Sequence, residues 1–256
     1  MRRRVKRLAF LGRIHSRIEA LEGLRWASQA GFSVWSADLM FGTPLETLAS
    51  WQSEFDVLLP YQPGGISFYG LTVEEGSLLQ RRQSAGEIVS LDQDKAVELM
   101  LGAAELLRSA AYRHYEVSNW ARAGSECRHN LHYWDRGWYL GLGPSAHSFR
   151  GNQRSWNLPD LSAYSAALEA RQLPPSDSEA LTDDEARTEW VYLGLRQGKG
   201  LDLDKYKELF GEAPAYWKTM LLSVAQKGLG NLAGERFIPN DRGLLLADEI
   251  AARLLS

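Results

Sequence analysis

The sequence predicts an α/β protein with a smaller α+β module at its carboxyl end. Helical and extended segments alternate through the first half, and a new run of helices followed by a short hairpin begins near residue 181. With 256 residues, 45% hydrophobic and 24% charged, the chain can form one large or two smaller domains. We expect an α/β region over residues 1–150, a linker with a helix over 151–180, and a winged-helix-like domain over 181–256.

The first expected helix follows Ser16, which forms a capping-box pattern with Glu19. Apolar residues continue at roughly helical spacing until Gly31 ends the segment. Residues 32–38 are mostly apolar and are typical of a strand that is buried on both faces of a parallel sheet. A helix followed by a buried strand is therefore the first predicted unit.

A second unit follows directly. Thr43, Pro44 and Glu46 supply a helix N-cap, a proline at the first helical position and a capping-box partner, and Pro60 closes this helix. Residues 66–71 form a second apolar strand. These residues predict that the order of helix and strand repeats.

The alternation continues with a helix over residues 93–109 and an extended segment over 112–117. This order favours right-handed parallel α/β units. Because two or three such strands cannot close a barrel, either the sheet keeps an exposed edge or another polypeptide segment completes it.

The carboxyl-terminal module begins after residues 174–178, which are typical of a linker. Thr182 and Glu185 cap a helix that runs to about Gln197. Further helices and extended pieces are expected at residues 203–210, 215–228, 229–232, 236–239 and 241–255. Three helices, a hairpin and a closing helix predict a winged-helix-like domain.

Charge and composition limit the expected partners. The formal net charge of −3 favours neither nucleic acid nor an anionic membrane, and the basic residues of the last module, Lys205, Lys207, Lys218 and Lys227, are interspersed with acids. No apolar run approaches the roughly 20 residues that cross a bilayer. The single cysteine, Cys127, fits a reducing compartment. We expect a soluble cytoplasmic protein without a membrane span or a nucleic-acid partner.

Residues 127–134 contain the most informative chemistry. Imidazole and thiolate are the usual axial donors to haem iron, and nearby aromatic residues can pack on the macrocycle, so we favour His129 as a haem ligand. Cys127, His129 and His132 are an alternative zinc set, although their spacing fits no common structural site and a fourth ligand is not evident. A third interpretation places the histidines, hydrogen-bonded, inside an aromatic-rich core.

Three glycines allow two interpretations. Gly42, Gly141 and Gly143 let a backbone approach a ligand without obstruction by a Cβ atom. Tight turns need glycine for the same dihedral reasons. The sequence leaves this choice open.

Several motifs together resemble one family. They are residues 12–16, 38–44, 66–69, 115–120, 126–134 and 139–148. In this order they look like the oxygen-independent coproporphyrinogen-III-oxidase-like group of radical S-adenosylmethionine proteins. Residues 129–134, His-Asn-Leu-His-Tyr-Trp, are similar to the HNxxYW motif of its haem-chaperone branch. The resemblance covers nearly the whole chain and implies the C-terminal part of a partial (β/α)6 barrel followed by the winged-helix-like domain.

The resemblance also implies a binding site for S-adenosylmethionine at the carboxyl ends of the barrel strands. Arg13 and Asp38 match family positions that contact this ligand, whose carboxylate and ammonium can pair with a guanidinium and a strand-end carboxylate. Without the family, Arg13 is a surface arginine and Asp38 a strand-terminal cap. Glu116 and Glu189 match acidic positions near the domain junction; we assign neither a catalytic role, and expect Glu189 to pair with an arginine.

The sequence departs from the family at its iron-sulfur cluster. The family holds a [4Fe-4S] cluster with three cysteines in a CxxxCxxC loop, whereas this chain has one cysteine and lacks the loop and the first four expected strands. Without a cluster no electron reaches S-adenosylmethionine, so radical chemistry by this chain alone is not expected and no catalytic residue is assigned. The chain is a truncated product, half of a split protein or a standalone remnant; we rank truncation first because of the open sheet edge.

These expectations define two functions. The first is a haem chaperone-like protein in which His129 ligates the iron of a haem that passes to an unidentified acceptor, with a remnant S-adenosylmethionine pocket. The alternative is a fragment of an oxygen-independent coproporphyrinogen III oxidase of porphyrin biosynthesis, active when joined to a cluster-bearing N-terminal segment or separate chain.

Overall fold

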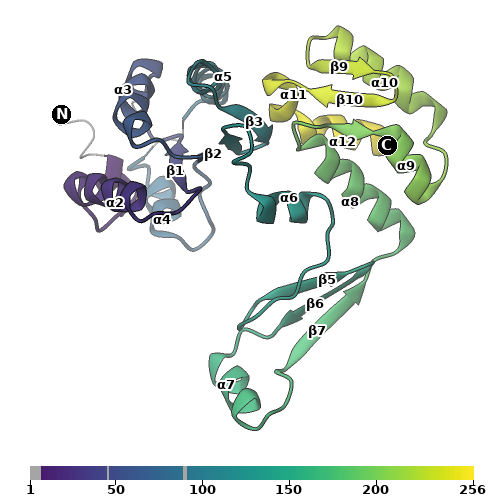
Figure 1. Ribbon diagram of the computed structural model, residues 1–256, viewed down its shortest axis with the longest axis horizontal. Coiled ribbons are helices and arrows are strands. Elements are labelled where there is room, and N and C mark those ends of the chain that lie inside the picture. The colour runs from purple at the N-terminus through teal and green to yellow at the C-terminus, as the bar shows by residue number, and fades with distance from the viewer. Residues whose placement is uncertain (1–6, 45, 89–90) are drawn as a thin grey trace. The chain divides into compact units, whose positions relative to one another are not determined.

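The computed structural model describes residues 7–44, 46–88 and 91–256. The chain divides into two compact units, Met1–Cys127 and Arg128–Ser256 (Figure 1). This division lies earlier than the boundary expected at residue 150, and it falls inside the segment that contains Cys127 and His129. Each unit has its own sheets and its own core, in agreement with the predicted α/β class.

The first unit contains one mixed sheet in the order β1-β2-β4-β3. Its elements are α2 (Arg17–Gln29), β1 (Ser36–Phe41), α3 (Leu48–Leu58), the 3-10 helix η1 (Leu59–Tyr61), β2 (Gly65–Gly70), α4 (Leu78–Ser84), α5 (Gln93–Ser109), β3 (Arg113–Glu116) and β4 (Asn119–Ala121). Residues 7–10 are also helical. Strands β1 and β2 are parallel and pair from Ser36 opposite Gly65 to Phe41 opposite Gly70. This parallel pair confirms the α/β units predicted for the start of the chain.

The third predicted unit has its helix, α5, and its strand, β3, which runs in the same direction as β2 but does not pair with it. The chain reverses after β3, and β4 inserts between β2 and β3, antiparallel to both. The reversal is a tight turn at Val117 and Ser118, and the backbone carbonyl of Ser118 accepts a hydrogen bond from the amide of Phe68 at 2.8 Å. The short β4 has too few residues to show a period of its own, so the sequence pattern merged it with β3.

An aromatic cluster forms the core on one face of this sheet. Phe68 of β2 stacks on Phe41 of β1 at 4.7 Å and receives the edge of Trp51 from α3 at 4.8 Å. Trp120 of β4 approaches Phe68 at 6.0 Å, and all four side chains are at least 90% buried. Helix α3 therefore covers this face of the sheet, and α5 packs beside α3.

Helix α3 begins four residues later than predicted. Its N-cap is Thr47, which forms a capping box with Ser50, and the helix starts at Leu48. The amide of Thr43 does donate to the Glu46 carboxylate, which is one of the two bonds of a capping box, but residues 43–44 and 46–47 are not helical. The reason is that the Glu46 carboxylate also bonds groups outside this turn, which holds the segment as a loop.

Helix α2 confirms its predicted start, because Ser16 and Glu19 form both bonds of a capping box. However, it buries none of its residues, and Ile18 and Trp26 are 70% and 60% exposed. Strand β1 begins at Ser36, whereas the sequence predicted a strand over residues 32–38. The apolar residues at the start of that range, Phe32 and Val34, are exposed. Among the described residues β1 pairs only with β2, so the sheet has the open edge considered from the sequence.

The second unit contains two antiparallel sheets. Its elements are α6 (Arg128–Trp134), β5 (His147–Arg150), β6 (Gln153–Asn157), α7 (Leu161–Glu169), β7 (Ser176–Ala180), α8 (Asp183–Leu195), β8 (Leu201–Asp202), α9 (Leu203–Phe210), α10 (Ala215–Gln226), β9 (Gly230–Ala233), β10 (Arg236–Pro239), α11 (Asp241–Leu245) and α12 (Ala247–Leu255). Strands β5, β6 and β7 form the first sheet in that order. The linker expected at residues 174–178 is therefore partly strand β7, whose exposed, polar side chains lack the alternation that marks a strand.

The carboxyl-terminal part has the predicted helices and hairpin. Thr182 and Glu185 form the expected capping box of α8, and β9 and β10 pair as an antiparallel hairpin to which β8 adds a third strand. The predicted closing helix is two helices, α11 and α12, separated at Leu246. Helix α12 packs on α8 over a core that includes the fully buried Leu195 and Phe237.

Two surface properties bear on the expected partners. Lys205, Lys207 and Lys218 each form an ion pair with a glutamate of the same domain. These pairs leave no one-sided basic face at those positions. Within the described ranges, no helix combines the length and the apolar character that crossing a bilayer requires.

Candidate functional site

His129 presents an open imidazole at the surface of the second unit. It lies on α6, is exposed, and its ring meets the edge of Tyr133, one helical turn later, at 4.7 Å and 90°. In the described part of the chain neither ring nitrogen takes part in a hydrogen bond. Burial in a core, the third interpretation, is wrong for this residue. Its nitrogens remain free to bind a metal centre that approaches from solvent.

His132 has a different environment. Its Nε2 lies 2.6 Å from the backbone carbonyl of Trp138, which accepts a hydrogen bond from the ring. The ring also lies flat on Gly137, where an added Cβ would stand only 2.2 Å from Cε1. His132 therefore joins α6 to the following segment. Of the two histidines in the motif, His129 alone has both ring nitrogens free of hydrogen bonds to described residues.

Aromatic side chains continue from His129 to strand β5. Tyr133 meets Tyr139 at 4.5 Å, and Tyr139 stacks on the buried Phe149 at 6.0 Å. The backbones of Tyr139 and Phe149 exchange two hydrogen bonds of 2.9 Å. These ring contacts and backbone hydrogen bonds hold α6 on the first sheet of the unit. They also give His129 the aromatic neighbours expected from the sequence.

The zinc interpretation finds no ligand set. In residues 7–44, 46–88 and 91–256, no three His, Cys, Asp or Glu side chains are arranged to hold a metal ion. Cys127 is exposed, and its backbone amide donates to the hydroxyl of Tyr115 at 3.3 Å. Burial raises the pKa of Tyr115 to about 12, so the hydroxyl stays protonated at neutral pH.

Asp38 lies within β1 and not at its end. It is exposed, and it belongs to a row of polar side chains that crosses the sheet. Asp38 stands opposite Ser67, Ser67 opposite Asn119, and Asn119 opposite Glu116. Because directly opposed residues share a face, this row occupies the face that α3 does not cover. The strand-end position predicted for Asp38 is thus wrong.

Arg13 is also exposed, in the turn that precedes α2. Among the described residues no hydrogen bond or ion pair joins Arg13 to Asp38. Both residues belong to the first unit, whereas His129 belongs to the second. Arg13 and Asp38, which were predicted to contact S-adenosylmethionine, are therefore two exposed side chains that do not bond each other.

Glu116 is the last residue of the polar row, and the sequence did not reveal that its side chain is buried. It is 1% exposed, its Oε1 has no hydrogen-bond partner in the part of the chain that the structure describes, and its Oε2 accepts from the amide of Ser118 at 3.4 Å. Burial raises the pKa of this carboxyl, against opposing hydrogen bonds from Asn119 and Ser118 and the nearby His114. A bulge between His114 and Glu116 directs the side chain onto this face, and a four-residue strand gives no sign of a bulge.

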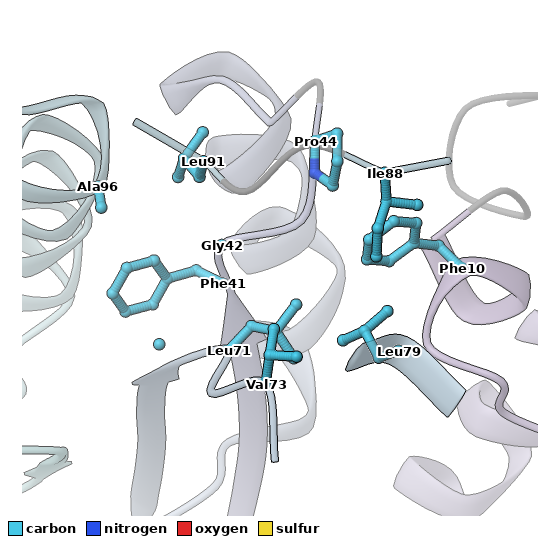
Figure 2. Close-up of a pocket in the computed structure, with 11 residues that line it drawn as sticks. Phe10, Phe41, Gly42, Pro44, Leu71, Val73, Leu79, Ile88, Leu91 and Ala96 are labelled. Atoms are coloured by element: carbon cyan, nitrogen blue, oxygen red, sulfur yellow. The ribbon is translucent and has the colours of Figure 1, made fainter. Parts of the chain in front are cut away.

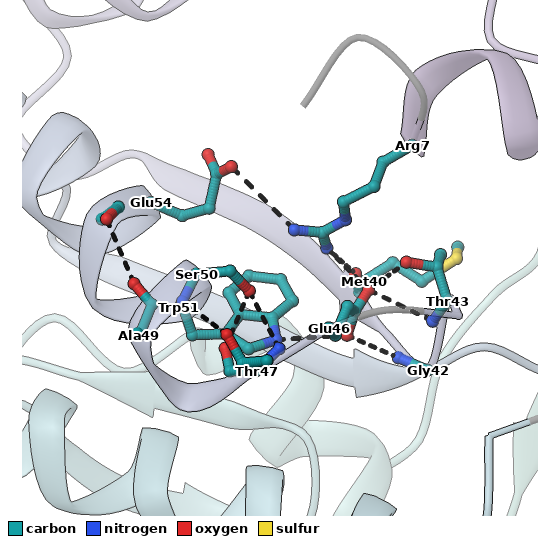
Figure 3. A network of polar contacts seen from close by, with 11 residues as sticks. Arg7, Met40, Gly42, Thr43, Glu46, Thr47, Ala49, Ser50, Trp51 and Glu54 are labelled. Carbon is teal, nitrogen blue, oxygen red and sulfur yellow. Dashed lines mark hydrogen bonds and ion pairs between the residues drawn. The ribbon is translucent and has the colours of Figure 1, made fainter. Parts of the chain in front are cut away.

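A buried carboxylate organises the loop after β1 (Figure 3). Glu46 accepts hydrogen bonds from the amides of Gly42 and Thr43, at 3.0 and 3.1 Å, and from the indole of Trp51 at 3.1 Å. It also forms an ion pair of 2.9 Å with Arg7, whose guanidinium lies 4.5 Å from the centre of the Trp51 ring. Both carboxylate oxygens are thereby used in the structure of the loop.

An apolar pocket of about 130 Å³ opens at the carboxyl ends of β1 and β2 (Figure 2). Its lining consists of Phe10, Phe41, Gly42, Pro44, Gly70, Leu71, Val73, Leu79, Ile88, Leu91 and Ala96. None of the described residues that line it is charged. At Gly42, which has a φ of +103°, an added Cβ would stand 3.2 Å from the amide of Leu71. This glycine serves the close approach of two strand ends, which favours the structural interpretation.

The glycines after α6 also serve the fold. A Cβ at Gly141 would lie 2.2 Å from the carbonyl oxygen of His147, so that position must be glycine for the chain to pass strand β5. Gly143 has a φ of +110°, and its amide and carbonyl bond Tyr164 and Asn157 at 3.0 and 2.9 Å. The backbone groups of this loop are occupied by their own unit, as the tight-turn interpretation expects.

Glu189 pairs with arginines, as predicted. It accepts from Arg136 at 2.8 Å and from Arg154 at 2.5 Å, and Arg154 also reaches Glu179 at 3.0 Å. These ion pairs connect α8 to strand β6 and to the turn after α6. Their role is to join the first sheet of the unit to the carboxyl-terminal helices.

Comparisons with known proteins agree with this architecture. Residues 181–246 match the family described as the HemN C-terminal domain. The chain is 36% identical over 248 residues to "Heme chaperone HemW" of Mycobacterium tuberculosis, covering 97% of this chain and 62% of that protein. It is 38% identical to "Radical S-adenosyl methionine domain-containing protein 1, mitochondrial" of Bos taurus, covering 96% of this chain and 55% of that protein.

The fold is also found in a solved structure. The chain matches coproporphyrinogen III oxidase (HemN) from Escherichia coli, described as a radical SAM enzyme, with a TM-score of 0.74 and 18% identity. The match covers 98% of this chain and 62% of that one, so the chain spans about three fifths of these relatives. These comparisons confirm the resemblance found in the sequence: the chain is similar along nearly its whole length to the relatives named heme chaperone HemW, and it has the fold of HemN.

Proposed function

We propose that this chain binds haem through His129 and passes it to an acceptor, as a haem chaperone. The observation that carries the proposal is the exposed imidazole of His129, whose two nitrogens are free within the described chain while His132 is engaged with Trp138. An exposed nitrogen donor with aromatic neighbours fits axial ligation of haem iron. The relatives named heme chaperone, at 26% to 36% identity over most of the chain, support this assignment.

The same exposure suits transfer. Haem would be held by His129 at an exposed position, where a ligand from an acceptor could also reach the iron. The residues around His129 contribute position: Tyr133 limits the rotation of the ring, and the bond from His132 to the Trp138 carbonyl fixes α6 on the following segment. Haem is thus a cargo of the protein, and its iron supplies the bond.

Titration with hemin tests this proposal. The wild-type chain should shift the Soret band and saturate at one haem per chain, and His129→Ala should lose the histidine-ligated spectrum. His147→Ala is a matched control, because His147 is also exposed and lies against an aromatic ring, Trp156, at 5.7 Å. A wild-type spectrum unchanged by hemin, or equal losses in His129→Ala and His147→Ala, would count against haem ligation by His129.

We propose further that the open face of the first sheet retains part of a site for S-adenosylmethionine. Asp38 and Arg13 are exposed and carry the charges that suit an ammonium and a carboxylate, and the polar row beside Asp38 offers further hydrogen-bonding groups. Calorimetric titration should detect weak binding that Asp38→Asn abolishes and Asp56→Asn, an exposed change on α3, preserves. Equal heats in all three proteins would contradict the assignment. The oxidase alternative has the match of residues 181–246 to the HemN C-terminal domain and the fold likeness at 18% identity, and neither bears on an activity.

A further inference from the structure

One edge of the sheet of β5, β6 and β7 is an extended segment with unpaired backbone groups. Tyr139 exchanges two hydrogen bonds of 2.9 Å with Phe149, so the segment runs antiparallel to β5. On either side of such a pair, the amides and carbonyls point away from the partner strand. Within the described chain, the amide of Trp138 and both backbone groups of Leu140 and Leu142 take part in no hydrogen bond. We call residues 138–142 the open edge.

The open edge is also apolar. Trp138, Leu140 and Leu142 are 62%, 77% and 81% exposed. They point to the face of the sheet opposite to Tyr139, because alternate residues of an extended segment face opposite ways. The segment contains no charged residue and no proline, which natural sheets use to keep an edge from pairing with another chain. An apolar edge with unpaired backbone groups is a surface to which a further strand can add.

The other edge of the same sheet is different. Strand β7 forms that edge, and all five of its side chains are exposed (Figure 1). They include Asp177 and Glu179 and no large apolar residue. Charges of this kind discourage the addition of a strand. The sheet therefore has one protected edge and one unprotected edge, which indicates that the open edge serves contact with a partner.

The open edge is held in place by its own unit. The carbonyl of Trp138 accepts a hydrogen bond from His132 at 2.6 Å, and the amide of Gly141 donates to the hydroxyl of Ser148 at 2.9 Å. With the pair between Tyr139 and β5, these bonds fix the segment along its length. A strand that adds to it loses only its own freedom, and such preorganisation favours binding.

Arg150 gives the open edge a preference for one charge. Its guanidinium lies 5.1 Å from the centre of the Trp138 ring, and it has no ion-pair partner among the described residues. The register of the sheet places Gln153 beside Arg150 and Ala180 beside Gln153, all on one face. The next row across that face consists of Ser148, Ser155 and Ser178. Because these two rows hold no carboxylate, the charge of Arg150 suits a carboxylate that a partner supplies.

We propose that the open edge binds an extended segment of another protein, which adds as an antiparallel strand, packs apolar side chains beside Leu140 and pairs a carboxylate with Arg150. Backbone hydrogen bonds supply affinity in this mode of recognition, and the side chains supply selectivity. A second copy of the chain suits the edge less well, because its own residues 138–142 bring no carboxylate to Arg150. The inference is independent of haem binding, since His129 contacts Tyr133 on the Tyr139 side of the segment.

A synthetic peptide tests the pairing. The probe is acetyl-Glu-Thr-Val-Thr-Val-Thr-Glu-amide, whose glutamates and valines lie on one face when it is extended. In nuclear magnetic resonance titrations of the isotope-labelled full chain, it should shift the amide signal of Leu140 and slow the hydrogen exchange of that amide. The same peptide with N-methyl groups on both valines cannot donate to the edge, so its Kd should be about tenfold higher.

Variants of the chain test the side chains. The wild type should bind the glutamate peptide more tightly than acetyl-Lys-Thr-Val-Thr-Val-Thr-Lys-amide. Arg150→Glu should raise Kd for the first peptide about threefold to tenfold and lower it for the second, because the favourable charge pair is exchanged. Arg242→Glu makes the same charge change on α11 and should leave both values unchanged. Leu140→Ser should raise Kd for both peptides about tenfold, whereas Leu173→Ser, at a residue 93% exposed, should not.

Circular dichroism confirms that each variant is folded. The N-methylated peptide binding as tightly as its parent would overturn the strand pairing, and equal effects of Arg150→Glu and Arg242→Glu would overturn the charge pair. Absence of binding by every peptide, together with a sedimenting dimer that Leu140→Ser dissociates, would overturn the proposed partner in favour of a second copy of the chain. Hemin titrations of Arg150→Glu and Leu140→Ser should match the wild type, so this inference and the proposed function fail separately.

Discussion

Replacing Glu46 by alanine tests whether one carboxylate holds the loop after β1. The Glu46 side chain is fully buried, with Gly42, Thr43, Trp51 and Arg7 as its partners. Each buried donor left without an acceptor costs about 1–3 kcal/mol, and removing one partner of a buried ion pair costs about 3–5 kcal/mol. Because the Arg7 side chain is 20% exposed and can turn toward water, we expect the lower end, a loss of about 3 kcal/mol.

The control is Glu54→Ala. Glu54 approaches the same Arg7 at 3.9 Å, but its side chain is 27% exposed, so its loss should cost about 1 kcal/mol or less (Figure 3). Urea unfolding, followed by circular dichroism, gives the free energies. Hydrogen exchange of peptides that cover β1 and α3 assigns the effect to the first unit, because the two units can unfold separately.

The expected pattern is a large loss of stability and faster exchange at residues 41–51 in Glu46→Ala, with little change in Glu54→Ala. Glu46→Gln should lie between them, because its amide keeps one acceptor oxygen and brings two donors toward amide hydrogens. If Glu46→Ala and Glu54→Ala differ by less than about 0.5 kcal/mol, the carboxylate does not organise the loop, and the reasoning from its hydrogen bonds fails.

Three other sites give further predictions. Gly137→Ala should displace the His132 ring from the Trp138 carbonyl and weaken hemin binding about threefold, measured by Soret titration; wild-type affinity would contradict the coupling. Glu116→Gln should remove a pH dependence: because burial raises the folded-state pKa of this carboxyl, wild-type stability falls as pH rises from the unfolded-state pKa through the folded-state pKa. Urea unfolding across that range should show a flatter profile in the variant, and parallel profiles would refute the assignment. Glu189→Gln should cost about 1–2 kcal/mol and speed hydrogen exchange in β6, because two arginines lose their shared carboxylate; unchanged exchange would show that the pairs do not hold the sheet.

The two histidines of one motif show what a sequence can predict and what it cannot. His129 and His132 are both exposed, and both have the same chemistry as isolated residues. The motif pattern favours His129, whereas the physical reason for the preference is tertiary: the Trp138 carbonyl and the space at Gly137 engage His132 alone. The contact that distinguishes the two histidines therefore has no sequence signal, and the choice of His129 as haem ligand stays a prediction.

Local interactions account for the expectations that were correct. The capping boxes of Ser16 with Glu19 and of Thr182 with Glu185 join residues three apart, so each pattern contains its own partner. The parallel pair of β1 and β2 and the helices of the carboxyl-terminal domain follow likewise from runs long enough to show a period. Patterns of neighbouring residues were thus sufficient for the α/β class and most helix starts.

Features that depend on distant partners required the folded chain. The Thr43 box did not start a helix, because Glu46 also bonds Trp51 and Arg7, and neither partner is visible in a four-residue pattern. In the same way, β4 exists as a strand because β2 and β3 lie on either side of it, and Glu116 is buried because a bulge turns it onto one face. Hydrogen bonds and burial between segments far apart along the chain arise only when the chain has folded, so no short stretch of residues contains them.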